Sequence, residues 1–104
     1  MTTTRKPKPS SLRFEVLNGF IDFSMDGLPR AELATWLVLY RDAKPPRWEA
    51  RTSVADIARR IGASKRAAST ALASLQSRGL LTVIQRGGLR QGPSVYAVRP
   101  VPPR

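Results

Sequence analysis

Apolar residues recur at helical spacing through the middle of the chain. Over residues 29–42 they follow the i, i+3, i+4, i+7 rule and predict a helix with one apolar stripe: Leu33, Trp36, Leu37 and Tyr40. Other positions of this segment are apolar too, so we expect cover on more than one side, from residues 12–25 or from a second copy of the protein. Pro29 suits the first helical position, and the Pro45-Pro46 pair ends the helix.

Two shorter helical segments follow, joined by a tight turn. The first covers residues 54–61, and the hydroxyl of Thr52 or Ser53 can cap it. Gly62 permits the left-handed backbone conformation that ends this helix. The second covers residues 65–78, and its predicted core stripe is Ala68, Ala71, Leu72 and Leu75.

The C-terminal part of the chain has the character of β-strands. Residues 80–86 are apolar and β-branched, and residues 94–99 alternate with a period of two, so we predict a strand in each. The glycine-rich residues 87–93 between them predict a hairpin loop. Residues 47–51 are short enough for a small edge strand or an extended loop.

The two ends of the chain do not share this patterning. Residues 1–11 are rich in Thr, Lys, Pro and Ser, and we predict a flexible basic arm there. Residues 12–25 hold all three phenylalanines, so we expect this segment to pack on the domain. Its periodicity fits neither a helix nor a strand, and an extended conformation is one that it could adopt. The predicted domain therefore covers residues 12–99, followed by a frayed tail at residues 100–104.

Positive charge is concentrated in the C-terminal part of the chain. The 104 residues carry 18 Lys and Arg against 7 Asp and Glu, a formal net charge of +11. Residues 44–104 hold twelve basic side chains against two acidic ones, whereas residues 12–43 hold three against five. This asymmetry indicates a binding face for a polyanion, most commonly nucleic acid, on a more acidic scaffold.

The composition argues against catalysis. Without His or Cys there is no imidazole base, no thiol nucleophile and no zinc site of the usual kind. Asp22 and Asp26 suit turn chemistry better than a metal site, and no serine stands with a plausible base. We predict no enzymatic activity, cofactor, metal or small-molecule ligand. No signal or membrane-spanning segment is evident, so we expect a cytoplasmic, nucleoid-associated protein.

Small and apolar residues have a characteristic spacing across the two short helices and the strand after them. They are Ile57, Ala58, Gly62, Ser64, Ala68, Leu72, Leu75, Gly79, Leu80 and Leu81. With the glycine-tipped hairpin, residues 29–99 resemble a winged helix-turn-helix domain, as in MarR-type regulators and plasmid and phage replication proteins. The resemblance implies a mainly helical α+β fold with three core helices and a C-terminal two-stranded wing.

The resemblance also implies sequence-specific binding of double-stranded DNA, with the helix 65–78 in the major groove and the wing 86–94 on the backbone or in the minor groove. The base-reading positions fall on Ser64, Lys65, Arg66, Ser69 and Thr70. The implied wing contacts are Arg86, Arg90 and Gln91, the phosphate contacts Arg59 and Arg60, and the arm contacts Arg5, Lys6 and Lys8. Because the recognition helix is rich in alanine, direct base readout is expected to be sparse.

The residues assigned to DNA contacts and to a dimer interface also have simpler interpretations. The basic pairs 65–66 and 59–60 could be ordinary solvated charges, and the arm a solubilising tail. Since one such unit reads few base pairs, we expect a homodimer, with a candidate interface of Phe14, Phe20, Phe23, Trp36, Leu39 and Tyr40 that could instead be core. The expected role is a transcriptional regulator or mobile-element accessory factor. The alternatives are a non-specific architectural DNA- or RNA-binding protein and a protein-interaction adaptor.

Overall fold

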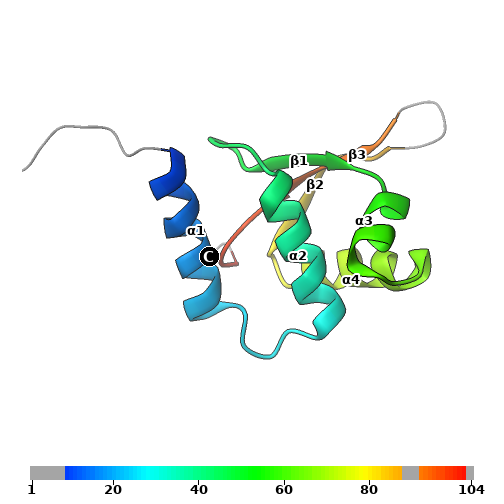
Figure 1. The fold of residues 1–104 in the computed structure, drawn as a ribbon, viewed down its shortest axis with the longest axis horizontal. Coiled ribbons are helices and arrows are strands. Elements are labelled where there is room, and N and C mark those ends of the chain that lie inside the picture. Colours follow the sequence, from blue (N-terminus) through cyan, green and yellow to red (C-terminus); the bar gives the residue numbers. More distant parts are fainter. Residues whose placement is uncertain (1–8, 88–91, 103–104) are drawn as a thin grey trace, which may run out of the picture.

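Four helices and three strands make up the fold (Figure 1). The computed structural model describes residues 9–87 and 92–102. Along the chain the elements are α1 (Pro9–Phe23), α2 (Arg30–Asp42), β1 (Glu49–Thr52), α3 (Val54–Ile61), α4 (Lys65–Ser77), β2 (Leu81–Gln85) and β3 (Ser94–Val98). The strands form one antiparallel sheet in the order β1-β3-β2. Helices α2, α3 and α4 contact one another, and α2 and α4 also contact the sheet.

This topology is that of a winged helix-turn-helix domain. The pair α3 and α4 forms the helix-turn-helix, and the hairpin of β2 and β3 forms the wing beside it. The predicted fold, mainly helical α+β with a two-stranded C-terminal wing, is confirmed. Residues 47–51 contribute to β1, which is an edge strand of the sheet and pairs with β3 of the hairpin.

Local sequence signals place both ends of α3 and the start of α4 as predicted. The Ser53 hydroxyl accepts a hydrogen bond from the Asp56 backbone N–H at 3.1 Å, and Ser64 accepts one from Ala67 at 3.0 Å. Gly62 has a φ of 70°, the left-handed value expected where α3 ends. Pro29 is the residue before α2 rather than its first helical residue. The serine caps of α3 and α4 each satisfy a backbone N–H of the first turn that has no partner within the helix.

The core lies between helices α2, α3 and α4 and the sheet, and Phe20 of α1 also belongs to it. The predicted stripe of α4 is buried throughout, with Ala68 and Leu75 fully inaccessible to solvent. Small Ala68 and Ala58 are both buried where α3 and α4 pack together. The other large contributors are Trp36, Leu39, Ile57, Leu81 and Tyr96.

The N-terminal segment differs from its prediction. Residues 9–23 form the helix α1, not an extended stretch, and the helix begins inside the segment 1–11 that was predicted to be an arm. Its Phe20 is fully buried and stacks on Trp36 of α2, with ring centroids 3.6 Å apart. The periodicity was uninformative because Phe14 and Phe23 are exposed and blur the apolar stripe of the helix.

Burial also corrects the candidate dimer interface. Four of its six residues belong to the core of one protomer and are at most 7% exposed: Phe20, Trp36, Leu39 and Tyr40. Phe14 and Phe23 are exposed and remain candidates.

The chain after β3 packs back against α1 and α2. The Trp36 indole N–H donates to the Arg99 carbonyl oxygen at 3.0 Å, and the Ser24 hydroxyl donates to the Pro100 carbonyl oxygen at 2.6 Å. These bonds tie α2 and the end of α1 to the segment that follows the wing, so α1 is an integral part of the domain. No helix among the described residues is long and apolar enough to cross a membrane.

Candidate nucleic-acid interface

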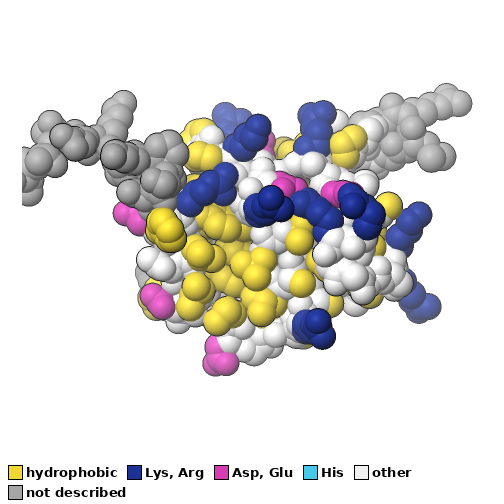
Figure 2. Space-filling model, in the orientation of Figure 1, with side chains coloured by type: hydrophobic (Ala, Val, Ile, Leu, Met, Phe, Trp, Pro, Cys, Tyr) yellow, Lys and Arg dark blue, Asp and Glu magenta, His cyan; other side chains and the backbone are white. Residues whose placement is uncertain are grey.

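Helix α4 separates its residues cleanly between core and solvent. Its predicted base-reading positions are all exposed: Ser64, Lys65, Arg66, Ser69 and Thr70. The intervening Ala68, Ala71 and Leu72 are buried against the rest of the domain. In Figure 2, Lys and Arg side chains project from the end of the molecule where α3 and α4 lie. The first turns of α4 therefore present polar and cationic side chains to the solvent.

The base of the wing is fixed by side-chain and backbone contacts. The Gly87 N–H donates to the Ser94 hydroxyl at 2.8 Å and closes the hairpin. A side chain at Gly87 would collide with the backbone of Gly92, so only glycine fits where the two chains of the hairpin come together. Arg86, one residue earlier, is exposed. The predicted wing-tip contacts Arg90 and Gln91, and the arm contacts Arg5, Lys6 and Lys8, lie outside the described residues.

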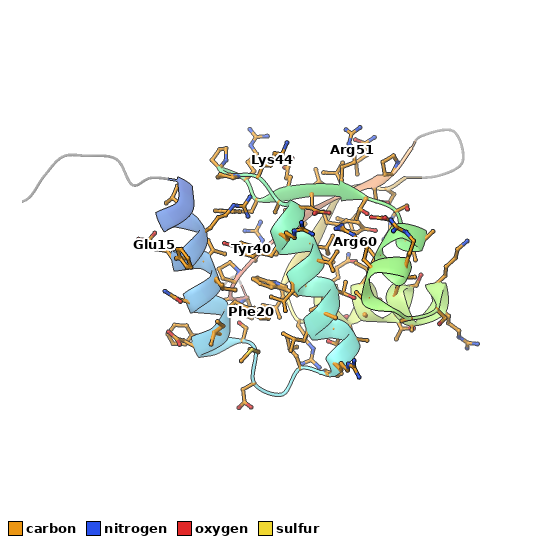
Figure 3. The ribbon with its side chains drawn as sticks, in the orientation of Figure 1. Glu15, Phe20, Tyr40, Lys44, Arg51 and Arg60 are labelled. Atoms are coloured by element: carbon orange, nitrogen blue, oxygen red, sulfur yellow. The ribbon has the colours of Figure 1, made fainter. Side chains whose placement is uncertain are left out.

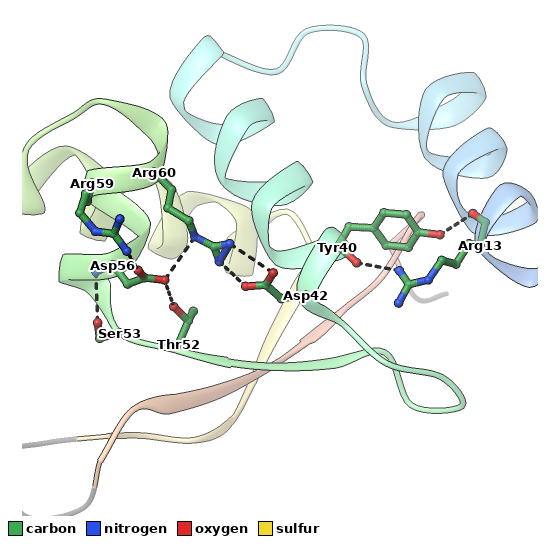
Figure 4. A network of polar contacts seen from close by, with 8 residues as sticks. All are labelled: Arg13, Tyr40, Asp42, Thr52, Ser53, Asp56, Arg59 and Arg60. Atoms are coloured by element: carbon green, nitrogen blue, oxygen red, sulfur yellow. Dashed lines mark hydrogen bonds and ion pairs between the residues drawn. The ribbon is translucent and has the colours of Figure 1, made fainter. Parts of the chain in front are cut away.

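The two arginines of α3 have different environments (Figure 4). Arg60 forms an ion pair with Asp42 of α2, and its Nε lies 3.2 Å from Asp56 Oδ2. Its side chain is 22% exposed, whereas that of Arg59, which pairs with Asp56, is 75% exposed. Arg60 thus links α3 to α2, a role that the sequence did not predict, and Arg59 alone has the exposure expected of a phosphate contact.

Asp56 is the centre of this polar network. Its Oδ2 accepts a hydrogen bond from the Thr52 hydroxyl at 2.9 Å, and its Oδ1 accepts one from Arg59. These hydrogen bonds, from Thr52 and then Arg59, hold the pKa of the Asp56 carboxyl below its usual value. The carboxylate therefore joins the end of β1 to the first turns of α3.

We expect Asp56→Asn to lower the melting temperature at neutral pH, with a smaller effect in acid. A carboxyl whose pKa is lowered by folding stabilises the protein above its unfolded pKa of about 4, and this contribution is lost as pH falls through the folded value. Melting both proteins between about pH 7 and pH 3 measures the difference. A difference that stays constant across this range would contradict the assignment.

A cationic and apolar groove runs between α1 and α2. Its lining residues are Arg13, Phe14, Leu17, Leu37, Tyr40 and Arg41. The Arg13 guanidinium donates to the Tyr40 and Ala43 carbonyl oxygens at 3.2 and 2.5 Å and lies over the rings of Tyr40 and Trp48. Burial raises the pKa of the Tyr40 hydroxyl, which donates to the Arg13 carbonyl oxygen. Figure 2 shows the apolar surface over these two helices.

Among the described residues, no group of His, Cys, Asp and Glu side chains could hold a metal ion. Asp22 and Asp26 are both exposed, at the end of α1 and in the turn before α2.

The sequence matches no protein-family model and no curated protein. Among solved structures, it is similar to the solution NMR structure of a homodimeric winged helix-turn-helix DNA-binding domain (fragment 1–100) from Mycobacterium bovis, described as a possible ArsR-family transcriptional regulator. The two are 17% identical, with a TM-score of 0.48, and the match covers 92% of this chain and 75% of the other. A likeness at this level transfers no function, so the fold assignment rests on the topology described above.

Proposed function

We propose that this protein binds double-stranded DNA at a specific sequence, with α4 in the major groove and the wing on the adjacent backbone or minor groove. One observation carries the proposal. Lys65 and Arg66 occupy the first turn of α4, directly after the Ser64 cap, and no acidic residue accompanies them. The helix macrodipole disfavours positive charge at this end, so the pair opposes the stability of its own helix. A bound polyanion reverses the sign of that effect.

The distribution of ion pairs supports the same face. Asp and Glu side chains pair with Arg59, Arg60 and Arg78 among the described residues. Lys65, Arg66 and Arg86 are exposed and have no such partner in that part of the chain. Their charge is therefore available to DNA phosphates and to guanine O6 and N7.

In this arrangement the proposed contacts divide by type. Lys65 and Arg66 would read base edges, while Ser69 and Thr70 reach a base or a phosphate. Arg59 would bind phosphate, and Arg86, Arg90 and Gln91 would place the wing. A cytoplasmic regulator of transcription, or an accessory factor of a mobile element, needs no chemistry beyond these contacts.

Non-specific binding of DNA or RNA is the second candidate function, favoured by the short side chains of Ala67 and Ala73, which are not buried in the core. Selection of bound duplexes from a random-sequence pool distinguishes the two. Specific binding enriches a consensus, and a dimer enriches two half-sites about one helical turn or a multiple of it apart. Recovery of unenriched sequence, or stronger retention of RNA, would contradict specific DNA binding.

We further propose that two copies associate through the groove between α1 and α2. Phe14 is 64% exposed and Leu37 43% exposed, although both line the same groove. Adjacent exposed apolar side chains in one groove support this proposal, because contiguous apolar surface is a feature of interaction sites. Phe14 thus remains from the predicted interface, and Leu37 takes the place of its four buried residues.

We expect Phe14→Lys to convert the protein from a dimer to a folded monomer at micromolar concentration, since each interface would bury two additional positive charges beside Arg13 and Arg41 of both copies. Light scattering measures the mass, and circular dichroism verifies the fold. Ile84→Lys is the matched control, because Ile84 is a similarly exposed apolar residue, 51%, on β2 outside this groove. A wild-type monomer, or dissociation by both variants alike, would refute the proposed interface.

A further inference from the structure

A second cationic surface lies away from the recognition helix, along β1 and the end of α2. We call it the β1 ridge and define it by Arg41, Lys44 and Arg51, all exposed. The three side chains line one surface hollow together with Asp42 and Glu49. Figure 3 shows Lys44 and Arg51 directed outward from the same edge of the molecule, and Figure 2 shows blue side chains along that edge.

The carboxylates in this hollow leave the three cations free. Asp42 is already paired with Arg60 across the α2–α3 contact. Glu49 lines the hollow but forms no ion pair within 4.0 Å among the described residues, and neither do the three ridge cations. The backbone oxygen of Glu49 accepts a hydrogen bond from the backbone N–H of Lys44 at 3.2 Å, which fixes the start of the ridge against β1. The ridge therefore has an excess of unpaired positive charge.

The ridge is continuous with the wing. Arg51 is opposite Val95 in the register of β1 with β3, and the next pair is Thr52 with Ser94. The Ser94 hydroxyl in turn accepts the hydrogen bond from Gly87 that closes the wing. Because β1 is an edge strand of the sheet, no further strand covers its outer side in the described residues. A duplex that contacts the wing can thus continue along the ridge.

We propose that the β1 ridge binds the phosphate backbone of DNA that flanks the site on the side of the wing. This inference rests on the proposed function and extends it, because it predicts a binding site longer than α4 and the wing can cover. Exposed, unpaired cations suit phosphates, which demand charge rather than a defined sequence. Charged side chains on an edge strand also prevent its pairing with another chain. This is the competing explanation for the ridge, and it requires no DNA.

The test is the triple variant Arg41→Gln, Lys44→Gln and Arg51→Gln with two duplexes, one limited to the selected consensus and one extended by about ten base pairs on each side. Each lost phosphate contact lowers the slope of log affinity against log salt by about 0.9. We expect the slope to fall by about two to three on the extended duplex and to remain unchanged on the short one. Light scattering verifies the oligomeric state, because Arg41 also lines the α1–α2 groove.

A pair of single variants controls for net charge. Arg51→Gln and Arg30→Gln remove the same charge, but Arg30 is exposed at the start of α2, outside the hollow of the ridge. Only Arg51→Gln should lower the slope on the extended duplex. An unchanged slope, or an equal loss on both duplexes, overturns the ridge. The same comparison on random-sequence duplexes tests the ridge even where specific binding fails, since phosphate contacts need no consensus.

Discussion

Replacement of Lys65 and Arg66 by alanine is expected to abolish specific DNA binding while slightly stabilising the folded protein. Each base contact of this kind is worth about 1–3 kcal/mol, so the double variant should lose at least about 30-fold in affinity. Removal of positive charge from the first turn of α4 should stabilise the helix by about 0.3–1 kcal/mol per residue. Gel shift and urea unfolding measure the two effects, which have opposite signs.

Arg30→Ala is the matched control for this experiment. Arg30 is the first residue of α2, so its charge stands at the same end of a helix as those of Lys65 and Arg66. It should show the dipole effect on stability without a loss of DNA affinity. Unchanged affinity in the double variant would show that the pair 65–66 is an ordinary solvated pair and that α4 does not bind DNA.

Phe20→Ala is expected to lower the free energy of unfolding by about 3–5 kcal/mol, a large part of the total stability of a small domain. Phe20 is fully buried and its ring stacks on that of Trp36, which in turn stacks on Tyr40 with centroids 5.1 Å apart. The variant removes the one side chain of α1 that is fully buried among those the structure describes. Urea unfolding measures the loss.

Phe23→Ala is the control because Phe23 is three residues further along the same helix and is 79% exposed. Its replacement should change the free energy of unfolding by less than about 0.5 kcal/mol. Equal effects of the two variants would contradict the docking of α1 through Phe20.

The helix-turn-helix was predictable because its signals are local. A serine cap acts on backbone groups three residues away, as Ser53 and Ser64 do, and the left-handed turn at Gly62 needs only a glycine. The division of α4 into a buried stripe and an exposed patch follows from helical periodicity alone. These features required no knowledge of tertiary structure.

The remaining features depend on partners that are distant in the sequence. Arg60 could not be separated from Arg59 because its partner Asp42 is 18 residues away on another helix. The burial of Phe20, and hence the helix α1, depends on Trp36 and on the chain that returns after β3. The β1 ridge exists only because β1 pairs with β3 and so aligns Arg51 with the wing. The periodicity and composition of the sequence do not predict such contacts between distant residues.

The most direct test of sequence-specific binding is the ratio of two affinities at about physiological salt: that for a duplex selected from a random pool and that for a random-sequence duplex of the same length. The proposed interface predicts a ratio of about a thousand or more, as is typical of specific DNA-binding proteins. A ratio below about ten would contradict it and would make this basic domain a non-specific binder of nucleic acid.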